Sequence, residues 1–290
     1  MNSEGGGQTQ AKKPGSEHKE ELLKIRDTFR KDVQSLRVKA FLLREMEKGD
    51  GERRRQAEEA QVPHKIVHFI RHGQGFHNVI HQVYKSFGSD VSPLGLGPKE
   101  GNPYCRPDVM DAPLTEVGRQ QARDLQEVTQ ILHKCELVCS SPLCRALQTA
   151  AIAFDYQIER EAVSNGASVR SKIPFVVREE VREQNGAHAC DKRRRISDLQ
   201  KEFPFFDFSM CTSDEDVFWG EEREPKLDVA RRAERFLQWL KDRDEKEMAV
   251  ATHSAFLATL FLVVLECEEG GRLTEWFHTG ELRSVGLMFS

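Results

Sequence analysis

Apolar and polar positions follow two different periods along most of this chain. Short apolar runs rich in Val, Ile, Phe and Ala have the length of buried strands, and between them apolar residues recur three and four positions apart, as on one helix face. The strands predicted in this way cover residues 65–70, 136–140, 173–178, 247–252 and 284–289. The predicted helices cover residues 76–86, 115–132, 142–154, 193–202, 226–243 and 254–266. This alternation predicts an α/β fold, a three-layer sandwich with a mostly parallel sheet and helices on both faces.

The amino-terminal part of the chain has a different pattern. Residues 1–16 are rich in Gly, Gln, Ser and Lys, which predicts a disordered leader. From Leu22 to Leu43 apolar residues recur at spacings of three and four, which predicts a helix over about 17–48 with one apolar stripe. We therefore expect a helical extension and linker over 17–62, followed by one domain over 63–290. The stripe fits docking on that domain, or pairing in a homodimer or with a partner protein.

Composition excludes several classes of function. The 290 residues are 38% hydrophobic and 31% charged with a formal net charge of −4, so we expect no nucleic-acid binding. The apolar stretch 255–265 is too short to cross a bilayer, so we expect no membrane insertion. Seven scattered cysteines favour reduced thiols, and no apolar signal segment precedes Leu22. These features predict a cytoplasmic protein, with the nucleus as the alternative.

Two histidines and two arginines stand where predicted strands end or a predicted helix begins. Arg71 and His72 follow the strand 65–70, and His253 follows the strand 247–252. Arg145 falls in the first turn of the helix 142–154. The carboxyl ends of parallel strands meet at the edge of an α/β sheet where ligands bind, and a helix amino terminus suits an anion. These four side chains predict a phosphate site.

Four short motifs contain these residues and appear in a fixed order over about residues 64–290. They are Arg71-His72-Gly73 with Asn78, Asp111-Ala112-Pro113-Leu114-Thr115 with Gly118, Ser141-Pro142 with Arg145, and Thr252-His253-Ser254. In this set the chain resembles the histidine phosphatase superfamily, also called phosphoglycerate mutase-like. The segments 182–193 and 281–284 resemble a branch of fungal, plant and protist mutase-like proteins. The resemblance implies an enzyme that transfers or hydrolyses a phosphoryl group.

The chemistry of the candidate residues is consistent with that activity. A neutral imidazole is a competent nucleophile near pH 7, so His72 can attack phosphorus and form a phosphohistidine. Guanidinium groups of Arg71 and Arg145 stabilise the negative charge of a transferring phosphoryl group. His253, if protonated, and Asn78, as a neutral group, supply further donors.

The leaving oxygen also needs a proton from a carboxyl group. Glu179, Glu180 and Glu183 all follow the predicted strand 173–178, and their spacing does not choose among them. The resemblance places the acid in the turn before Gly186 and so favours Glu183, with Glu180 as the rival. This scheme requires no cofactor. The sequence has no His-Glu-x-x-His or paired Cys-x-x-Cys spacing, so we expect no metal.

Three further residues are candidates for the substrate pocket. His77 and His188 lie inside the motifs, and Arg193 belongs to the basic run 192–195. The loop 88–113, rich in Gly and Pro, is predicted to cover the site. The substrate is expected to be a small phosphorylated molecule, with sugar phosphate, phosphopeptide, nucleotide and inositol phosphate all open.

The predicted function is hydrolysis of a phosphomonoester through His72. The first alternative is phosphotransfer of the phosphoglycerate mutase type, in which a second hydroxyl replaces water as the acceptor. The second is a non-catalytic protein that binds a phosphorylated ligand.

Overall fold

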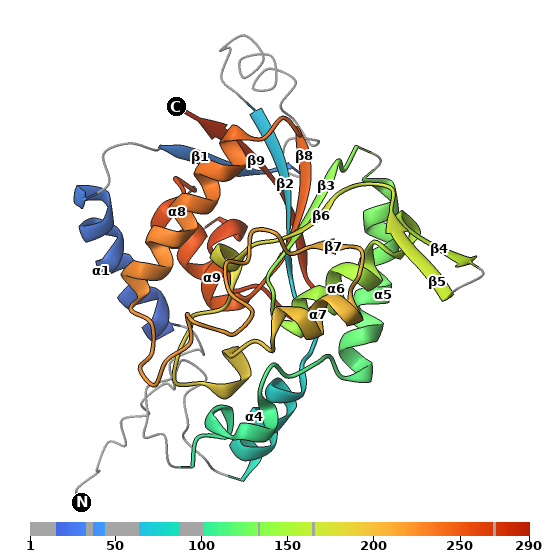
Figure 1. Ribbon diagram of the computed structural model, residues 1–290. Helices are drawn as coiled ribbons and strands as arrows, with labels where there is room; N and C mark the ends of the chain where they lie inside the picture. The colour runs from blue at the N-terminus through green and yellow to red at the C-terminus, as the bar shows by residue number, and fades with distance from the viewer. Residues whose placement is uncertain are drawn as a thin grey trace, which may run out of the picture.

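A mixed seven-stranded sheet forms the centre of the molecule (Figure 1). The computed structural model describes residues 16–32, 37–43, 64–87, 101–132, 134–163, 166–268 and 271–290. Five strands run parallel, namely β2 (His64–Arg71), β8 (Glu247–Thr252), β3 (Leu137–Ser140), β6 (Phe175–Val177) and β7 (Phe206–Asp207). On the other side of β2, β9 (Leu282–Phe289) and β1 (Val38–Leu42) extend the sheet in antiparallel fashion.

The register of the parallel strands brings the predicted site residues together. Arg71 at the end of β2 lies beside Thr252 at the end of β8. Ser140 at the end of β3 lies beside Ala251 of β8 and Val177 of β6. The segments that follow these strands therefore start from one edge of the sheet, as the sequence predicted.

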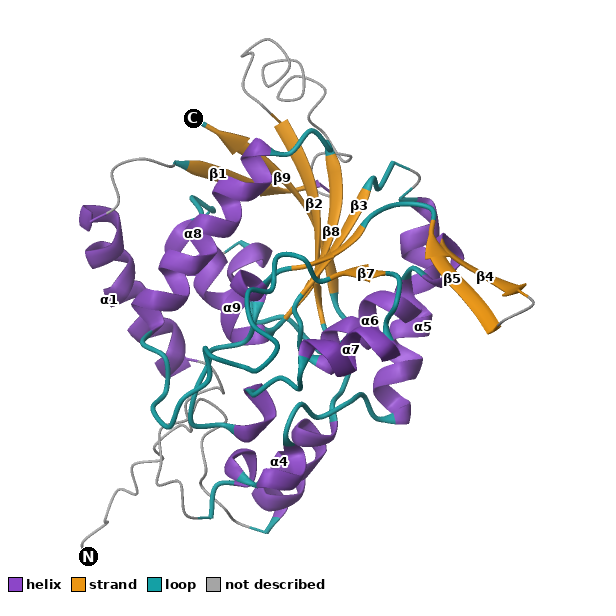
Figure 2. Cartoon of the chain, in the orientation of Figure 1, coloured by secondary structure: helices purple, strands orange, loops and turns teal. Residues whose placement is uncertain are grey.

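Helices cover both faces of the sheet (Figure 2). One layer contains α1 (Ser16–Asp32), α8 (Lys226–Asp242) and α9 (Ser254–Thr259), which continues as a π-helical turn over Leu260–Val264. The other contains α5 (Glu116–Ile131), α6 (Cys144–Ala153) and α7 (Ile196–Glu202). Both sheet faces are buried, because Val67 and Phe69 of β2 pack in one hydrophobic cluster and Ile70 packs in the other. The three-layer α/β fold is confirmed.

Short elements lie beyond the carboxyl ends of the strands. There α4 (Phe76–Ser86) contacts the 3-10 helix Pro103–Cys105, which is followed by a second 3-10 turn at Pro107–Val109. Two more 3-10 turns, Glu179–Val181 and Ala189–Asp191, follow β6, and a further one lies at Arg272–Thr274.

A separate hairpin was not predicted. It consists of β4 (Ile158–Val163) and β5 (Gly166–Ser171) and is preceded by the 3-10 turn Asp155–Gln157.

The predicted helix over 17–48 is confirmed over residues 17–32 and is wrong at residues 38–42. Within that range the chain forms β1, whose odd and even positions alternate between buried and more exposed. The sequence signal was ambiguous, because Val38, Ala40 and Leu42 fit a strand period while Ala40 and Leu43 also continue the helical stripe. Since β1 is an edge strand of the main sheet, residue 63 does not separate two packing units. Residues 1–15 of the predicted leader 1–16 lie outside the described residues, as do residues 88–100 of the loop 88–113. Ser16, the last residue of that leader, is the first residue of α1.

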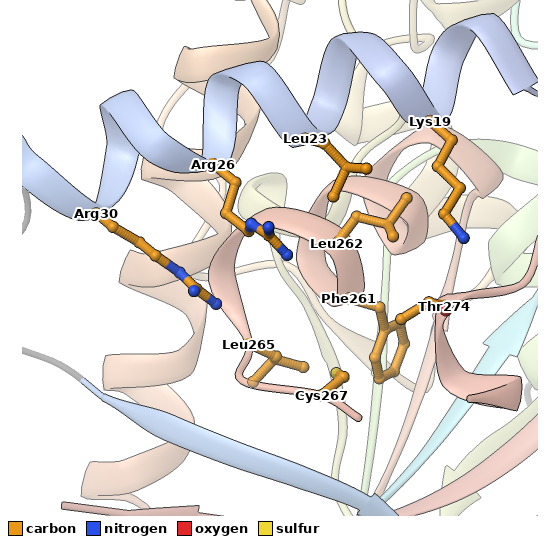
Figure 3. Close-up of a pocket in the computed structure, with 9 residues that line it drawn as sticks. All are labelled: Lys19, Leu23, Arg26, Arg30, Phe261, Leu262, Leu265, Cys267 and Thr274. Carbon is orange, nitrogen blue, oxygen red and sulfur yellow. The ribbon is translucent and has the colours of Figure 1, made fainter. Parts of the chain in front are cut away.

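The helix α1 docks on its own domain. Its side chains Leu22 and Phe29 are buried in the cluster that α8 and the π-helical turn also form. Beside this contact, the helix and the segment 261–274 enclose a pocket of about 230 Å³ (Figure 3). Basic and apolar side chains line it: Lys19, Leu23, Arg26, Arg30, Phe261, Leu262, Leu265, Cys267 and Thr274. From Leu22 to Phe29, the predicted apolar stripe is thus buried against the domain of the same chain.

None of the helices in the described part of the chain has both the length and the apolar character needed to span a membrane.

Replacement of Leu22 should test the docking of α1. Leu22 is fully buried, so Leu22→Ala should lower the free energy of unfolding by about 2–5 kcal/mol. Urea unfolding measures this, with the exposed Lys24→Ala on the same helix as the control. Equal stability of the two variants would show that α1 does not pack on the domain.

His18 should make the stability of the protein depend on pH. Its buried ring lies 5.5 Å from the ring of Trp276, and burial followed by the charge of Lys226 lowers its pKa to about 4. In the unfolded chain His18 binds a proton as the pH falls through about 6.5, whereas in the folded chain it binds one only near pH 4. The free energy of unfolding is therefore highest above pH 6.5 and decreases as the pH falls toward 4. His18→Gln should reduce the loss of unfolding free energy between pH 7 and pH 4.5 by roughly 2 kcal/mol. An unchanged loss in urea titrations at the two pH values would contradict this.

Candidate active site

His72 presents one unprotonated ring nitrogen at the carboxyl end of β2. Its Nδ1 lies 2.6 Å from the carbonyl oxygen of Gly73, which only accepts, so Nδ1 carries the proton. Nε2 therefore keeps its lone pair, and Nε of Arg145 donates a hydrogen bond to it at 3.3 Å. The sequence predicted His72 as the nucleophile, and the geometry identifies Nε2 as the atom that can attack.

The surroundings of His72 keep its ring neutral. Burial has the largest effect, and the charges of Arg145, His77 and Arg71 act in the same direction, so the pKa of His72 is well below its usual value. A neutral ring retains the lone pair that a nucleophile needs, so His72 is ready for attack over a wide range of pH.

Buried contacts fix the guanidinium group of Arg145. Its two terminal nitrogens donate to the carbonyl oxygen of Cys190 at 2.6 Å and to Oδ1 of Asp191 at 2.8 Å, which leaves Nε aimed at His72. The second oxygen of Asp191 accepts from Arg223 at 2.8 Å. Burial alone would raise the pKa of Asp191, but Arg223, the His188 ring and Arg145 hold it well below its usual value. Asp191 is therefore an ionised group that orients the guanidinium of Arg145.

From the sequence, His253 was expected to act as a donor if its ring were protonated; in the structure a neutral ring can also donate. Its ring Nε2 lies 2.8 Å from Oγ of Ser141, and that same oxygen accepts from the backbone N–H of Leu143. Among the described residues, Nε2 is the acceptor that the Ser141 hydroxyl reaches, so we assign the hydroxyl proton to this contact and the ring proton to Nδ1. Burial and the charge of Arg145 lower the pKa of His253, so its ring is neutral.

Two buried nitrogens add to the donors around His72. Nε of Arg71 and Nδ1 of His253 have no hydrogen-bond partner among the described residues. One terminal nitrogen of Arg71 donates to the carbonyl oxygen of Phe277 at 2.6 Å, which fixes the side chain. The rings of His72 and His253 lie 5.0 Å apart. Together with Nε of Arg145, these groups offer three N–H donors, enough to bind the three oxygens of a phosphoryl group.

The side chain of Glu183 packs against the amino terminus of α9, the helix that begins directly after His253. Its Oε1 accepts from the backbone N–H groups of Gln184 and Ala255, each at 3.0 Å, and Ser254 donates to Oε2 at 3.2 Å. A helix amino terminus suits a carboxylate in this way.

The carboxylates of the two rival glutamates, Glu179 and Glu180, form ion pairs with arginines. Glu180 forms a bidentate ion pair with Arg178, and Glu179 pairs with Arg182 and Arg193. Of the three glutamates considered from the sequence, Glu183 is the one that lies next to His253.

Of the remaining predicted site residues, some lie near His72 and others are held by different contacts. His77 is buried with its ring 5.6 Å from that of His72, and His188 lies beside Asp191. Asn78 uses Oδ1 to accept from the N–H of Gly75, so only its amide nitrogen remains as a donor. Arg193 is a correction, because all five N–H donors of its guanidinium group bind Glu179 and the backbone of residues 194 and 213–215. It holds this segment in place instead of lining a substrate pocket.

Several residues that shape the site were missed from the sequence. Asp111 accepts from the N–H of Cys144 at 2.8 Å and so caps α6 in front of Arg145. Arg232 donates to the carbonyl oxygen of Glu183 at 2.9 Å. Gly73 is required for packing: a side chain there would place Cβ 2.4 Å from the carbonyl oxygen of Gly118 on α5. The only sequence signal for these residues was that Asp111, Gly73 and Gly118 fall inside the quoted motifs.

One group near the site has the composition of a metal site. Potential ligand atoms of His188, Cys190 and Asp191 lie within 4.8 Å of one another. However, two guanidinium groups already bind the carboxylate of Asp191, and burial raises the pKa of the Cys190 thiol well above its usual value. These features favour an ion-paired cluster over a cation site.

Comparisons with known proteins agree with this arrangement. A sequence model of the histidine phosphatase superfamily (branch 1) matches residues 106–283, which include Arg145, Glu183 and His253. "Phosphoglycerate mutase-like protein 1" of Arabidopsis thaliana is 37% identical over 242 residues, which cover 76% of this chain and 80% of that protein. A "Probable phosphatase" of Schizosaccharomyces pombe is 29% identical over 193 residues, which cover 65% of this chain and 74% of that protein. The chain belongs to the histidine phosphatase superfamily.

Loss of the Ser141 hydroxyl should disturb the tautomer of His253. Ser141→Ala removes the donor to Nε2, so the ring proton can move away from Nδ1 and one phosphate contact weakens by about 1–1.5 kcal/mol. We expect roughly a tenfold fall in kcat/KM on an aryl phosphate, with a shift of the His253 nitrogen signals in ¹⁵N NMR. Ser140→Ala is the control, because Ser140 donates only to the backbone of Ser141. A wild-type spectrum with the proton on Nε2 would contradict the assignment.

Proposed function

We propose that this protein is a phosphomonoester phosphatase that works through a phosphohistidine on His72. The observation that carries the proposal is the bare Nε2 of a neutral, buried His72, facing Nε of Arg145. The unpaired N–H groups of Arg71 and His253 lie around the same ring.

The reaction takes place in two displacements. Before the first displacement Glu183 must take up a proton, because its contacts at the start of α9 favour the carboxylate. The lone pair of Nε2 then forms a bond to phosphorus, the bond from phosphorus to the ester oxygen breaks, and Glu183 gives its proton to the leaving oxygen. In the second, Glu183 takes a proton from water as the water oxygen bonds to phosphorus and the N–P bond breaks. Inorganic phosphate leaves, and both His72 and Glu183 return to their starting states.

The donors act mainly on the transition state. During each displacement the negative charge spreads over the three equatorial oxygens, where fixed N–H groups in a water-poor site stabilise it strongly. Arg145, Arg71 and His253 contribute one such group each.

The alternative of a phosphoglycerate mutase differs only in the acceptor of the second step. Relatives carry both kinds of name, "Phosphoglycerate mutase-like protein 1" and "Probable phosphatase". Hydrolysis is favoured by what the resemblance implies: the residues expected after Asn78 to grip a phosphoglycerate in the glycolytic mutases are replaced here by residues 79–86, which form the rest of α4.

A non-catalytic binder is disfavoured by the same site. A protein that only held phosphate would gain nothing from a bare imidazole nitrogen or from a carboxyl group beside His253.

The cysteines bear on the compartment in which the protein works. All seven are in the thiol form. This supports a reducing compartment, and we infer the cytoplasm or the nucleus.

The proton transfer assigned to Glu183 can be tested with two classes of substrate. Glu183→Gln cannot protonate the leaving oxygen, so kcat on an alkyl phosphate should fall about 10²–10⁴-fold. An aryl phosphate with a good leaving group should lose less than about tenfold in its first step, because its leaving oxygen needs little help. Glu180→Gln is the matched control. Equal losses on both substrates would show that Glu183 only binds, and a selective loss at Glu180→Gln would move the role to that residue.

A further inference from the structure

A cluster of four rings borders the nucleophile on the side of α4 and the first 3-10 helix. His77 lies 5.6 Å from His72, Tyr104 lies 6.0 Å from His77, and His188 stacks on Tyr104 at 5.1 Å. His81 stacks on Tyr104 at 5.3 Å and nearly parallel to it. The rings of His77, Tyr104 and His188 are at least 94% buried, since their exposed fractions are 6%, 6% and 3%. Because this polar ring cluster adjoins His72, it is placed to contact whatever the phosphoryl group is attached to.

Two nitrogens of the polar ring cluster are buried and have no hydrogen-bond partner in the part of the chain that the structure describes. They are Nδ1 of His77 and Nε2 of His188. Nδ1 of His188 faces the ionised Asp191 at 3.7 Å, and the carboxylate favours a ring proton on that nitrogen. In the neutral ring with its proton on Nδ1, Nε2 offers a lone pair. A buried acceptor without a partner is unfavourable, and a hydroxyl group of a ligand would satisfy it.

The His77 and Tyr104 members of the polar ring cluster carry no charge at neutral pH. Burial, with Arg145 as the next cause, lowers the pKa of His77 well below its usual value. Burial also raises the pKa of Tyr104, so its hydroxyl stays neutral. Tyr104 is linked to the nucleophile through His77, whose ring lies 6.0 Å from that of Tyr104 and 5.6 Å from that of His72.

The neighbouring arginines are already paired with carboxylates. Each arginine between residues 178 and 232 forms at least one ion pair: Arg178–Glu180, Arg182–Asp216, Arg193–Glu179, Arg194–Asp111, Arg195–Glu215, Arg223–Asp191, Arg231–Asp228 and Arg232–Glu224. A carboxylate or a second phosphate on the substrate would lose its water without gaining an unpaired arginine from this segment. Such burial of an unpaired charge is strongly unfavourable.

We propose that His77, Tyr104 and His188 select a neutral, hydroxylated leaving group, so that the substrate is the phosphate ester of a polyol or sugar. This inference rests on the proposed phosphatase function. A substrate hydroxyl donates to Nε2 of His188, and the neutral polar edges of Tyr104 and His77 accept or donate to its neighbours. Esters with a carboxylate beside the phosphate, such as phosphoglycerate, are rejected.

A matched pair of substrates tests this selection. Glycerol 3-phosphate and 3-phosphoglycerate differ in one end group, a neutral CH₂OH against a carboxylate. For the full-length protein we expect kcat/KM to be at least tenfold higher on glycerol 3-phosphate. An aryl phosphate measured in parallel reports whether the phosphoryl chemistry itself is intact.

Variants locate the selection in the polar ring cluster. His188→Ala and Tyr104→Phe should each lower the ratio of kcat/KM on glycerol 3-phosphate to that on the aryl phosphate by at least fivefold. Tyr156→Phe is the matched control, because Tyr156 donates to the carbonyl oxygen of Thr129, away from the site, and the ratio should not change.

The outcomes separate this inference from the proposed function. If 3-phosphoglycerate is hydrolysed as fast as glycerol 3-phosphate or faster, while turnover of the aryl phosphate still requires His72, the proposed selection is wrong and the phosphatase function stands. An unchanged ratio in both cluster variants would also overturn the selection. Failure of the wild-type protein to hydrolyse even the aryl phosphate would overturn the phosphatase function itself.

Discussion

The hydrogen bond from Nε of Arg145 to Nε2 of His72 is the contact on which the rest of the site depends. A guanidinium group can donate to an imidazole only if that nitrogen keeps its lone pair, so the contact requires a neutral ring with its proton on Nδ1. The carbonyl oxygen of Gly73 holds that proton, and burial prevents a second one from binding. An incoming phosphate would take over the Arg145 donor and leave Nε2 free to attack. Arg145 can thus bind Nε2 of His72 before the substrate arrives and then stabilise the phosphoryl group that Nε2 attacks.

The charge of Arg145 must in turn be balanced, because the guanidinium group is buried. Asp191 supplies the negative charge and also binds Arg223, so one carboxylate joins the site to the segment that carries Trp219 and Glu224. Breaking a buried ion pair of this kind leaves an uncompensated charge, which typically costs 3–5 kcal/mol. The arginines of residues 178–232 and their carboxylate partners therefore form an ion-paired frame behind the phosphate donors. In the proposed function, the rings of His77, Tyr104 and His188 form the surface that meets the rest of the substrate.

Much of this architecture is readable from the sequence, for a physical reason. The strands β2 and β8 are buried on both faces, so each is a continuous apolar run that ends at a functional residue, and their parallel register then places His72 beside His253. The strand β1 could not be predicted in this way, because its five residues fit two periods and it is stable only where β9 offers a free edge. The roles of Asp111 and Asp191 were equally hidden, since each depends on a partner brought close by the fold. The prediction for Arg193 was wrong for the opposite reason. Its basic run suggested an exposed anion site, whereas Glu179 and backbone carbonyl oxygens bind its guanidinium group.

The central claim is that Nε2 of His72 carries the phosphoryl group during turnover. The most direct measurement is to stop the reaction with an aryl phosphate in denaturant at high pH, where an N–P bond survives, and to locate the phosphoryl group by mass spectrometry and ³¹P NMR. The expected result is one phosphoryl group on Nε2 of His72 in the wild-type protein and none in His72→Asn. A phosphoryl group on Nδ1 or on another residue, or rapid turnover by His72→Asn, would contradict this account.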